Sequence, residues 1–485
     1  MTSNEIINTA NVAFSIKTFV AAMLAYFVAI SLDIPKPFWA IATVYIVANP
    51  LTSSILSKSL YRLLGTLIGV IATLVIIPNF ANEPVLLAST VILWVSLCTF
   101  ISLLDRSPRG YVALLAGYTV LLAGLPLVDS PHNSFETVAS RVEEITLGII
   151  CASFIGHMVF PSHVGNVLLS RIDGWGDRAQ YLLLKTFTGE ICGKESRKER
   201  YALATSAGDI RSLATLLRYD GSRYRHAVAL IRTLQHRMVS MLPLLSEMED
   251  LRQTLFQLNT PISTRILSLL NGFELSSAAL NASFFRRLAR IKPAETSGSW
   301  ERLMLVNLTR NLQAIARIAK ECSSLREAAE DEKAFRLTRS TVAHRISASA
   351  QHRDIGMALL SAMTVAICLA SSTLFWAVSG WRNGMTYTQM SGVFCCLLAA
   401  LDDPVPAMNK FLGVTIVCVV AAFCYSFAVL PMIDGFIPLV AALGLFLIPA
   451  GICLAVPSLA IVGMGLCINF PLLLTLQSKH TPDIW

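Results

Sequence analysis

Long apolar stretches separated by short polar segments occupy both ends of this 485-residue chain. A helix needs about 20 apolar residues to cross the hydrocarbon core of a bilayer, and most of these stretches have about that length. We therefore expect each stretch to form a membrane-spanning helix. The six expected spans in the first part cover residues 12–32, 38–56, 60–78, 84–104, 111–128 and 138–160. The five expected spans in the last part cover residues 355–378, 385–401, 408–430, 436–451 and 455–475.

The region between the two apolar parts has a different pattern. In residues 210–217, 227–255 and 300–325, apolar positions recur every three to four residues, which is the period of amphipathic helices in a bundle. The chain is thus expected to be an all-α polytopic membrane protein, in which two transmembrane halves of about six and five helices flank a helical domain. The expected domains are the N-terminal transmembrane half (1–161), a basic helical domain (162–353) and the C-terminal transmembrane half (354–485), which is incomplete with five spans.

The basic residues indicate an orientation. Of the 39 Lys and Arg residues, 29 lie between Pro161 and Arg353, and the connections of the first half alternate between basic and non-basic. Because Lys and Arg stay on the cytoplasmic side of a membrane, we expect the N-terminus and the central domain to be cytoplasmic. An odd number of spans in the second half then places Trp485 outside. Topology and lipid-surface charge account for basic residues beside spans, so we expect no nucleic-acid partner.

The two transmembrane halves share a short motif. An apolar stretch ends at Asn49-Pro50 in the first half and at Asp403-Pro404 in the second, and each is followed by a basic residue with a glycine three positions later. The residues are Arg62 and Gly65 in the first half, and Lys410 and Gly413 in the second. Both copies run in the same direction, so the repeat is parallel. Transporters place substrates at interrupted helices between repeats, but a proline also ends a helix at a membrane surface, and both interpretations stay open.

Several motifs occur in an order that is found in one known family. They are FWAIATVYIVANP (38–50), YRLLGTLIG (61–69), SRVEEITLGI (140–149), FCCLLAALDDP (394–404) and IVGMGLCINFPLLL (461–474). In these segments the chain resembles the fusaric acid resistance and aromatic acid exporter family of bacterial inner-membrane proteins. Family members usually carry a sixth span in the second half. Here the chain stops where that span is expected to begin.

The resemblance implies a function and partners. It implies export of small aromatic carboxylic acids, of the hydroxybenzoate or fusaric acid type, driven by the proton gradient. A periplasmic membrane-fusion adaptor and an outer-membrane channel are the implied partners, a homo-oligomer is compatible with it, and no cofactor or metal is implied. A passive organic-anion channel and a membrane-anchored sensor without transport are the alternatives. An enzyme is disfavoured, because the sequence has no P-loop, dinucleotide fingerprint or H-E-x-x-H motif.

Polar and ionisable residues in or beside spans are the candidate functional residues, because charges within a membrane are costly. Arg141 and Glu144 lie three residues apart on one helix face, where Arg141 is a candidate to bind a substrate carboxylate and Glu144 to accept a proton. An ion pair at the start of a helix is the structural alternative. The other substrate-binding candidates are Asn49, Trp39, Arg62 and Arg109. The other proton-coupling candidates are Asp402, Asp403, Asp105 and His157. Topology, helix ends and interfacial anchoring are the alternatives for these residues.

Overall fold

The computed structural model describes residues 8–105, 108–128, 131–159, 163–219, 227–258, 260–270, 299–330, 354–401 and 404–475, together with residues 224 and 286. Every element in these residues is a helix, which confirms the expected all-α fold class. The chain forms two compact units. We call Met1–Ser162 with Ala350–Trp485 the membrane unit and His163–Ser349 the helical unit.

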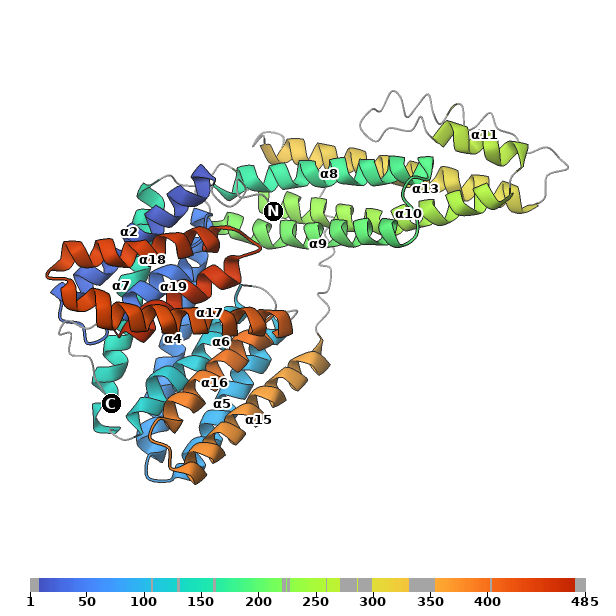
Figure 1. Cartoon of the computed structure of the whole chain (residues 1–485). Coiled ribbons are helices and arrows are strands. Elements are labelled where there is room, and N and C mark those ends of the chain that lie inside the picture. The colour runs from blue at the N-terminus through green and yellow to red at the C-terminus, as the bar shows by residue number, and fades with distance from the viewer. Residues whose placement is uncertain are drawn as a thin grey trace. The chain divides into compact units, whose positions relative to one another are not determined.

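The membrane unit consists of two runs of helices (Figure 1). The first run contains α2 (Thr9–Ser31), α3 (Phe38–Val47), α4 (Thr52–Phe80), α5 (Pro84–Leu104), α6 (Gly110–Thr119), η1 (Val120–Gly124), η2 (Leu125–Leu127), η3 (Pro131–Asn133) and α7 (Ser134–Met158). The second run contains α15 (Ile355–Ser379), α16 (Gly384–Ala399), α17 (Pro404–Cys424), η6 (Tyr425–Val429), η7 (Leu430–Met432), α18 (Phe436–Ala455) and α19 (Ala460–Leu474).

Seven helices among the described residues are long and apolar enough to cross a membrane: α2, α4, α5, α6 with its extension, α15, α17 with its extension, and α18. Two more apolar helices, α3 and α19, have 10 and 15 residues and are too short by this measure. Helix α7 has 25 residues but carries Arg141, Glu143 and Glu144. The chain is therefore a polytopic membrane protein with some irregular spans.

The expected span over 38–56 was wrong, because the helix breaks in the middle of this stretch. Helix α3 ends at Val47, and the backbone is extended at Ala48 and Leu51 before α4 begins. The Asn49 side chain accepts a hydrogen bond from the backbone N–H of Leu51 at 3.0 Å. Ten helical residues rise about 15 Å, which is about half of the hydrocarbon core. Hydropathy alone does not detect this break, because the residues around it remain apolar.

The two runs of the membrane unit pack on one another reciprocally. The first helix of each run packs on the fourth helix of the other, α2 on α18 and α15 on α5 (Figure 1). The second helices contact the fifth helices in the same way, α3 on α19 and α16 on α6. Within each run the third helix packs on the fifth, α4 on α6 and α17 on α19. Parallel repeats related by an axis along the membrane normal give this arrangement.

Helix α7 is the exception to this reciprocity. It packs on α2, α3 and α4, and none of the described helices takes the corresponding place against α15, α16 and α17. Small residues allow its close contact, as they do between helices in membranes generally. A Cβ at Gly148 would lie 2.7 Å from the Thr43 Cβ and 2.8 Å from the Ala40 carbonyl oxygen. The backbones of α7 and α3 therefore meet without room for a side chain.

Glycines of α4 set its distance to α6. A Cβ at Gly65 would lie 2.8 Å from Leu115, and one at Gly69 would lie 2.6 Å from Thr119. Four residues along α4 thus correspond to four along α6, so these two helices run parallel. The result is a tight layer of α3, α4, α6 and α7 in the first half of the membrane unit.

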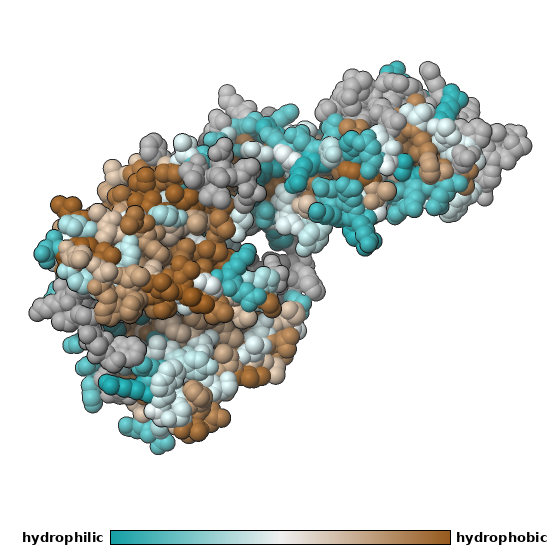
Figure 2. Space-filling model, in the orientation of Figure 1, coloured by the Kyte–Doolittle hydropathy of each residue, from teal (hydrophilic) through white to brown (hydrophobic). Residues whose placement is uncertain are grey.

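The helical unit contains α8 (Val164–Thr188), α9 (Lys194–Leu216), η4 (Leu217–Tyr219), α10 (Val228–Leu258), α11 (Pro261–Leu270) and α13 (Ser299–Glu330). Helix α9 packs on α8 and α10, and α10 also packs on α13 and α11. On the face in Figure 2, hydrophilic residues predominate along this unit, whereas hydrophobic residues gather over α17, α18 and α19 of the membrane unit. Exposed apolar side chains such as Leu412 and Phe423 on α17 fit contact with lipid.

A buried carboxylate fixes the turn between α8 and α9. Glycine at position 189 ends α8 in the left-handed conformation, with φ +79°, which favours glycine. Glu249 of α10 accepts a hydrogen bond from the Gly193 N–H at 2.6 Å and another from the Arg200 guanidinium. Burial alone raises the pKa of the Glu249 carboxyl, but the hydrogen bonds from Arg200, Ser196 and the Gly193 N–H outweigh burial, and the pKa lies below its usual value.

Candidate functional site

A buried ion pair lies inside α7. The Nη1 atom of Arg141 is 3.2 Å from Oε2 of Glu144, and the two side chains are 11% and 2% exposed. Because α7 begins at Ser134 rather than at 138, this pair lies two to three turns into the helix. The pair is therefore not a surface ion pair at a helix end, because both charged groups are buried away from solvent.

The Arg141 guanidinium also rests on an aromatic ring. Its central carbon lies 3.8 Å from the centroid of the Trp39 ring on α3, which is the geometry of a cation–π contact. Lys36, in the connection between α2 and α3, is close enough for its charge to act on both Arg141 and Glu144. The structure thus places Trp39, a separate candidate from the sequence, against the Arg141–Glu144 pair.

Arg62 of α4 adds a second buried guanidinium to this region. Its side chain is 3% exposed, its Nη1 donates to the Tyr111 hydroxyl at 3.1 Å, and its Nη2 lies 3.5 Å from the Thr43 hydroxyl. The Tyr118 hydroxyl also contacts it, and its charge repels that of Arg141. Its Nε has no hydrogen-bond partner among the described residues. We call Trp39, Arg62, Tyr111, Tyr118, Arg141 and Glu144 the arginine cluster.

The arginine cluster has more positive than negative charge. Arg62 and Arg141 each carry a full positive charge, because guanidinium groups stay protonated in proteins, and Glu144 is the carboxylate that faces Arg141. The partners named above for Arg62 are neutral hydroxyls. A buried charge without a counter-ion is unfavourable. The cluster is therefore suited to receive an anion.

The other candidates at the ends of the spans lie elsewhere. Arg109 is the exposed residue that precedes α6, and Asp105 is the half-buried residue that follows α5. Asn49 uses its side chain to cap the break after α3. With Lys17 and Gly156 it also lines a cavity of about 10 Å³, which holds one water at most. These residues therefore have positions consistent with topology and helix ends.

The remaining proton-coupling candidates are outside the cluster. His157 is exposed on α7, with Nδ1 3.0 Å from the Ser153 carbonyl oxygen. It follows Glu144 by 13 residues, which is about 20 Å along a helix. Asp402 and Asp403 lie outside the residues that the structure describes.

Sequence reasoning missed three residues at the site: Lys36, Tyr111 and Tyr118. Lys36 falls in a short polar connection, and Tyr111 begins a span two residues after a basic loop. One signal was present for Tyr111. It precedes Tyr118 by seven residues, which places the two hydroxyls on one face of α6.

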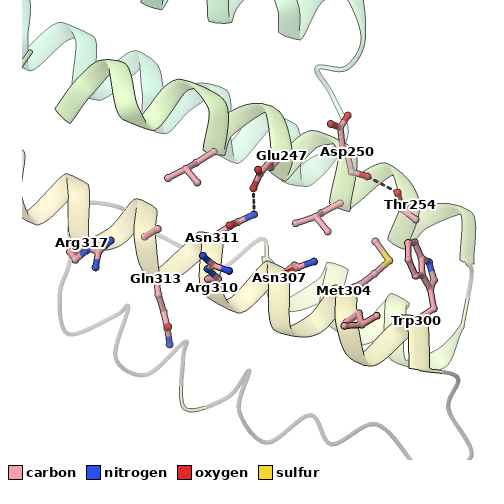
Figure 3. Close-up of a pocket in the computed structure, with 14 residues that line it drawn as sticks. Glu247, Asp250, Thr254, Trp300, Met304, Asn307, Arg310, Asn311, Gln313 and Arg317 are labelled. Carbon is pink, nitrogen blue, oxygen red and sulfur yellow. Dashed lines mark hydrogen bonds between the residues drawn. The ribbon is translucent and has the colours of Figure 1, made fainter. Parts of the chain in front are cut away.

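The helical unit has an open groove of about 1090 Å³ along α10 and α13. Trp300, Met304, Asn307 and Arg310 of α13 line it, and Glu247 of α10 accepts a hydrogen bond from Asn311 across it (Figure 3). Its acidic and basic side chains are mixed, and the charges do not select one class of ligand. The arginine cluster is the better candidate site.

Comparisons with known proteins agree with this membrane architecture. The chain is 26% identical over 442 residues to the p-hydroxybenzoic acid efflux pump subunit AaeB of Musicola paradisiaca (strain Ech703), covering 86% of this chain and 64% of that protein. It is 24% identical over 438 residues to the uncharacterized transporter YdhK of Escherichia coli (strain K12), covering 87% and 62%. The chain thus spans somewhat less than two thirds of the length of these relatives. The model of the fusaric acid resistance protein family matches residues 11–485, and the chain belongs to this family, as its motifs predicted.

Proposed function

We propose that this protein is a membrane efflux transporter for small aromatic carboxylic acids, of the hydroxybenzoate or fusaric acid type. The observation that supports this proposal is the burial of two neighbouring guanidinium groups, Arg62 and Arg141, of which Arg141 alone has a carboxylate partner, Glu144, among the described residues. A carboxylate substrate supplies the missing negative charge. Arginine binds such a group through two parallel hydrogen bonds, which gives both affinity and orientation.

The aromatic part of the substrate also has partners in the cluster. Trp39 of α3 lies against the Arg141 guanidinium, and Tyr111 and Tyr118 of α6 contact the Arg62 guanidinium. Aromatic rings pack on one another in stacked or edge-to-face arrangements, and ligand sites combine such apolar walls with a few polar groups. One relative carries the name of a p-hydroxybenzoic acid efflux pump subunit, which is consistent with this substrate class.

Glu144 links the site to protons in this proposal. When Glu144 is ionised it holds Arg141, and when it is protonated that attraction is lost and Arg141 is available to an anion. Proton binding and anion binding therefore favour each other, as linkage requires. For the proton motive force to drive export, the proton passes from the periplasm through Glu144 to the cytoplasm, and the re-formed Arg141–Glu144 pair releases the anion outward. The membrane potential, which is negative inside, favours both movements.

The proposal includes an orientation and partners. The basic connections favour a cytoplasmic N-terminus and a cytoplasmic helical unit in the cell inner membrane, so that α7 enters from the periplasmic side. We propose a periplasmic membrane-fusion adaptor and an outer-membrane channel as partners. The word "subunit" in the name of one relative is consistent with such an assembly.

Accumulation of labelled 4-hydroxybenzoate tests the function. The chain and its adaptor are expressed in cells that lack their own aromatic acid exporters, with and without a protonophore. The proposal predicts low accumulation that rises with the protonophore, and high accumulation in the Arg62→Gln variant at equal protein level. Accumulation that the chain does not change would contradict export. Flux that follows the membrane potential and persists without a pH gradient would instead identify a passive anion channel.

A further inference from the structure

One face of α4 carries a row of polar side chains. Ser59, Arg62 and Thr66 are separated by three and four residues, so they lie on consecutive turns of the same face. All three are buried. Burying a polar side chain within a membrane protein costs free energy unless the side chain forms hydrogen bonds. The side chains of this row therefore need hydrogen-bond partners.

The described residues do not supply these partners. Within the part of the chain that the structure describes, the Ser59 Oγ, Arg62 Nε and Thr66 Oγ1 atoms have no hydrogen-bond partner. Other buried threonines of the unit bond back to the carbonyl four residues earlier, Thr73 at 2.8 Å and Thr119 at 2.7 Å. Single buried hydroxyls without a partner also occur elsewhere among the described residues of the membrane unit, at Tyr45, Ser53, Ser96 and Thr388. What distinguishes this face is that three such side chains, one of them charged, follow one another on consecutive turns of one helix.

The row faces α7 and leads toward Glu144. A Cβ at Gly156 would meet the Ile55 side chain at 3.1 Å, and α4 and α7 run in opposite directions. Thr66 follows Ile55 by eleven residues along α4, and Ile145 precedes Gly156 by eleven residues along α7. Ile145 is adjacent to Glu144. Thr66 is thus level with the ion pair of α7, and Ser59 lies two turns closer to the α3–α4 break.

We propose that the seam between α4 and α7, lined by Ser59, Arg62 and Thr66, is hydrated and forms the route by which water and anions reach Arg62 and Glu144. Ordered water supplies the hydrogen bonds that these three side chains lack. Arg62 gives the seam a positive charge and favours anions within it. The use of this route by an aromatic carboxylate rests on the proposed function, whereas its hydration does not.

Cysteine accessibility tests the seam. Ser59→Cys and Thr66→Cys are made singly in a chain whose 11 native cysteines are replaced, after that chain is shown to remain monodisperse in detergent. Leu60→Cys and Leu67→Cys are the matched controls, because they lie one residue further along α4 and their native side chains are exposed on the apolar exterior. A hydrophilic, negatively charged methanethiosulfonate is the probe, since only a thiolate in contact with water reacts.

The proposal predicts labelling of Ser59→Cys and Thr66→Cys about tenfold or more faster than labelling of the two controls, because a tenfold change needs only about 1.4 kcal/mol of difference in access. It also predicts that Arg62→Gln reduces the preference for the anionic over the cationic reagent. Equal labelling of seam and control positions would overturn the hydrated seam.

A second arm separates this inference from the proposed function. Adding 4-hydroxybenzoate is expected to slow the labelling of Thr66→Cys while leaving Leu67→Cys unchanged, which supports both. Fast labelling of Thr66→Cys that the acid does not slow leaves the hydrated seam standing and contradicts its use by an aromatic carboxylate. Slow labelling with intact export contradicts the seam alone.

Discussion

The third helices of the two transmembrane halves, α4 and α17, carry the same motif in opposite surroundings. Arg62 is buried in α4, where its guanidinium meets Tyr111 and Thr43. Lys410, its counterpart in α17, is exposed. Gly65 leaves no room for a side chain against α6, whereas a Cβ at Gly413 would meet no atom within 4 Å. A motif that repeats in the sequence is therefore not repeated as a site.

The difference has a structural cause. In the first half α7 packs on α4, α3 and α2. It brings Arg141, which is paired with Glu144, close enough to Arg62 for the two positive charges to interact. In the second half α17 turns another face inward, since Gly465 of α19 packs against its Val414, and the face with Lys410 and Gly413 points outward. The charged site thus depends on α7 and on the helix face that is buried.

The largest expected difference is between two variants in which the basic residue of the motif is replaced by glutamine, one in each half. Arg62→Gln removes the buried charge that we propose binds the substrate. Such losses cost about 2–5 kcal/mol, so export is expected to fall roughly 30-fold or more. Lys410→Gln, the matched change in the second half, leaves export within about twofold, because an exposed charge contributes little. Efflux of labelled 4-hydroxybenzoate at equal protein level measures both. Equal losses in the two variants would show that the halves do not differ in function.

Arg141→Ala is expected to lower export about tenfold, with a smaller effect on the amount of protein in the membrane.

Glu144→Gln fixes the state in which Arg141 is free, so substrate affinity loses its increase toward acidic pH. Titrations of substrate binding at several pH values measure this dependence. An unchanged dependence in Glu144→Gln, together with its loss in an Asp402→Asn/Asp403→Asn double variant, would move proton coupling to the second half.

The two glycines of the motif compare packing rather than charge. Gly65→Ala places a methyl group 2.8 Å from Leu115 and from the Val112 carbonyl oxygen, and overpacking of this kind costs about 1–3 kcal/mol. Gly413→Ala meets open space and is expected to be neutral or slightly stabilising, because alanine favours a helix. Thermal unfolding of the intact protein in detergent measures the difference. A similar loss in both variants would show that the outward face of α17 is covered.

The Arg200–Glu249 ion pair of the helical unit is a structural counterpart to the Arg141–Glu144 pair of the membrane unit, and we expect its loss to have a smaller effect. The folded-state pKa of Glu249 is lowered, so its stabilisation is present above the unfolded pKa and is lost as the pH falls through the folded pKa. Glu249→Gln is expected to cost about 2 kcal/mol at neutral pH and progressively less in acid. Export per folded molecule should stay unchanged, unlike in Glu144→Gln. A stability loss that does not depend on pH would contradict this role of the carboxylate.

The sequence predicted the fold class and most helices because long apolar stretches report directly on membrane spans. It missed the end of α3 at Val47, since hydropathy continues through the break. It also placed Arg141 at the start of a span, although α7 begins at Ser134 and buries it. The contrast between Arg62 and Lys410 was beyond the sequence, because it depends on which face of each helix packs inward. Tyr111 and Lys36 join the site for the same tertiary reason.

Equilibrium binding of 4-hydroxybenzoate to the purified protein shows most directly whether the arginine cluster of the first half binds aromatic carboxylates. The comparison uses the unmodified chain, Arg141→Ala and Lys410→Gln, with 4-hydroxybenzyl alcohol as a neutral analogue. We expect the acid to bind the unmodified chain and Lys410→Gln equally well, and Arg141→Ala about tenfold or more weakly. The alcohol is expected not to bind. Binding that is insensitive to Arg141, or equal for the acid and the alcohol, would contradict recognition of aromatic carboxylates by the arginine cluster.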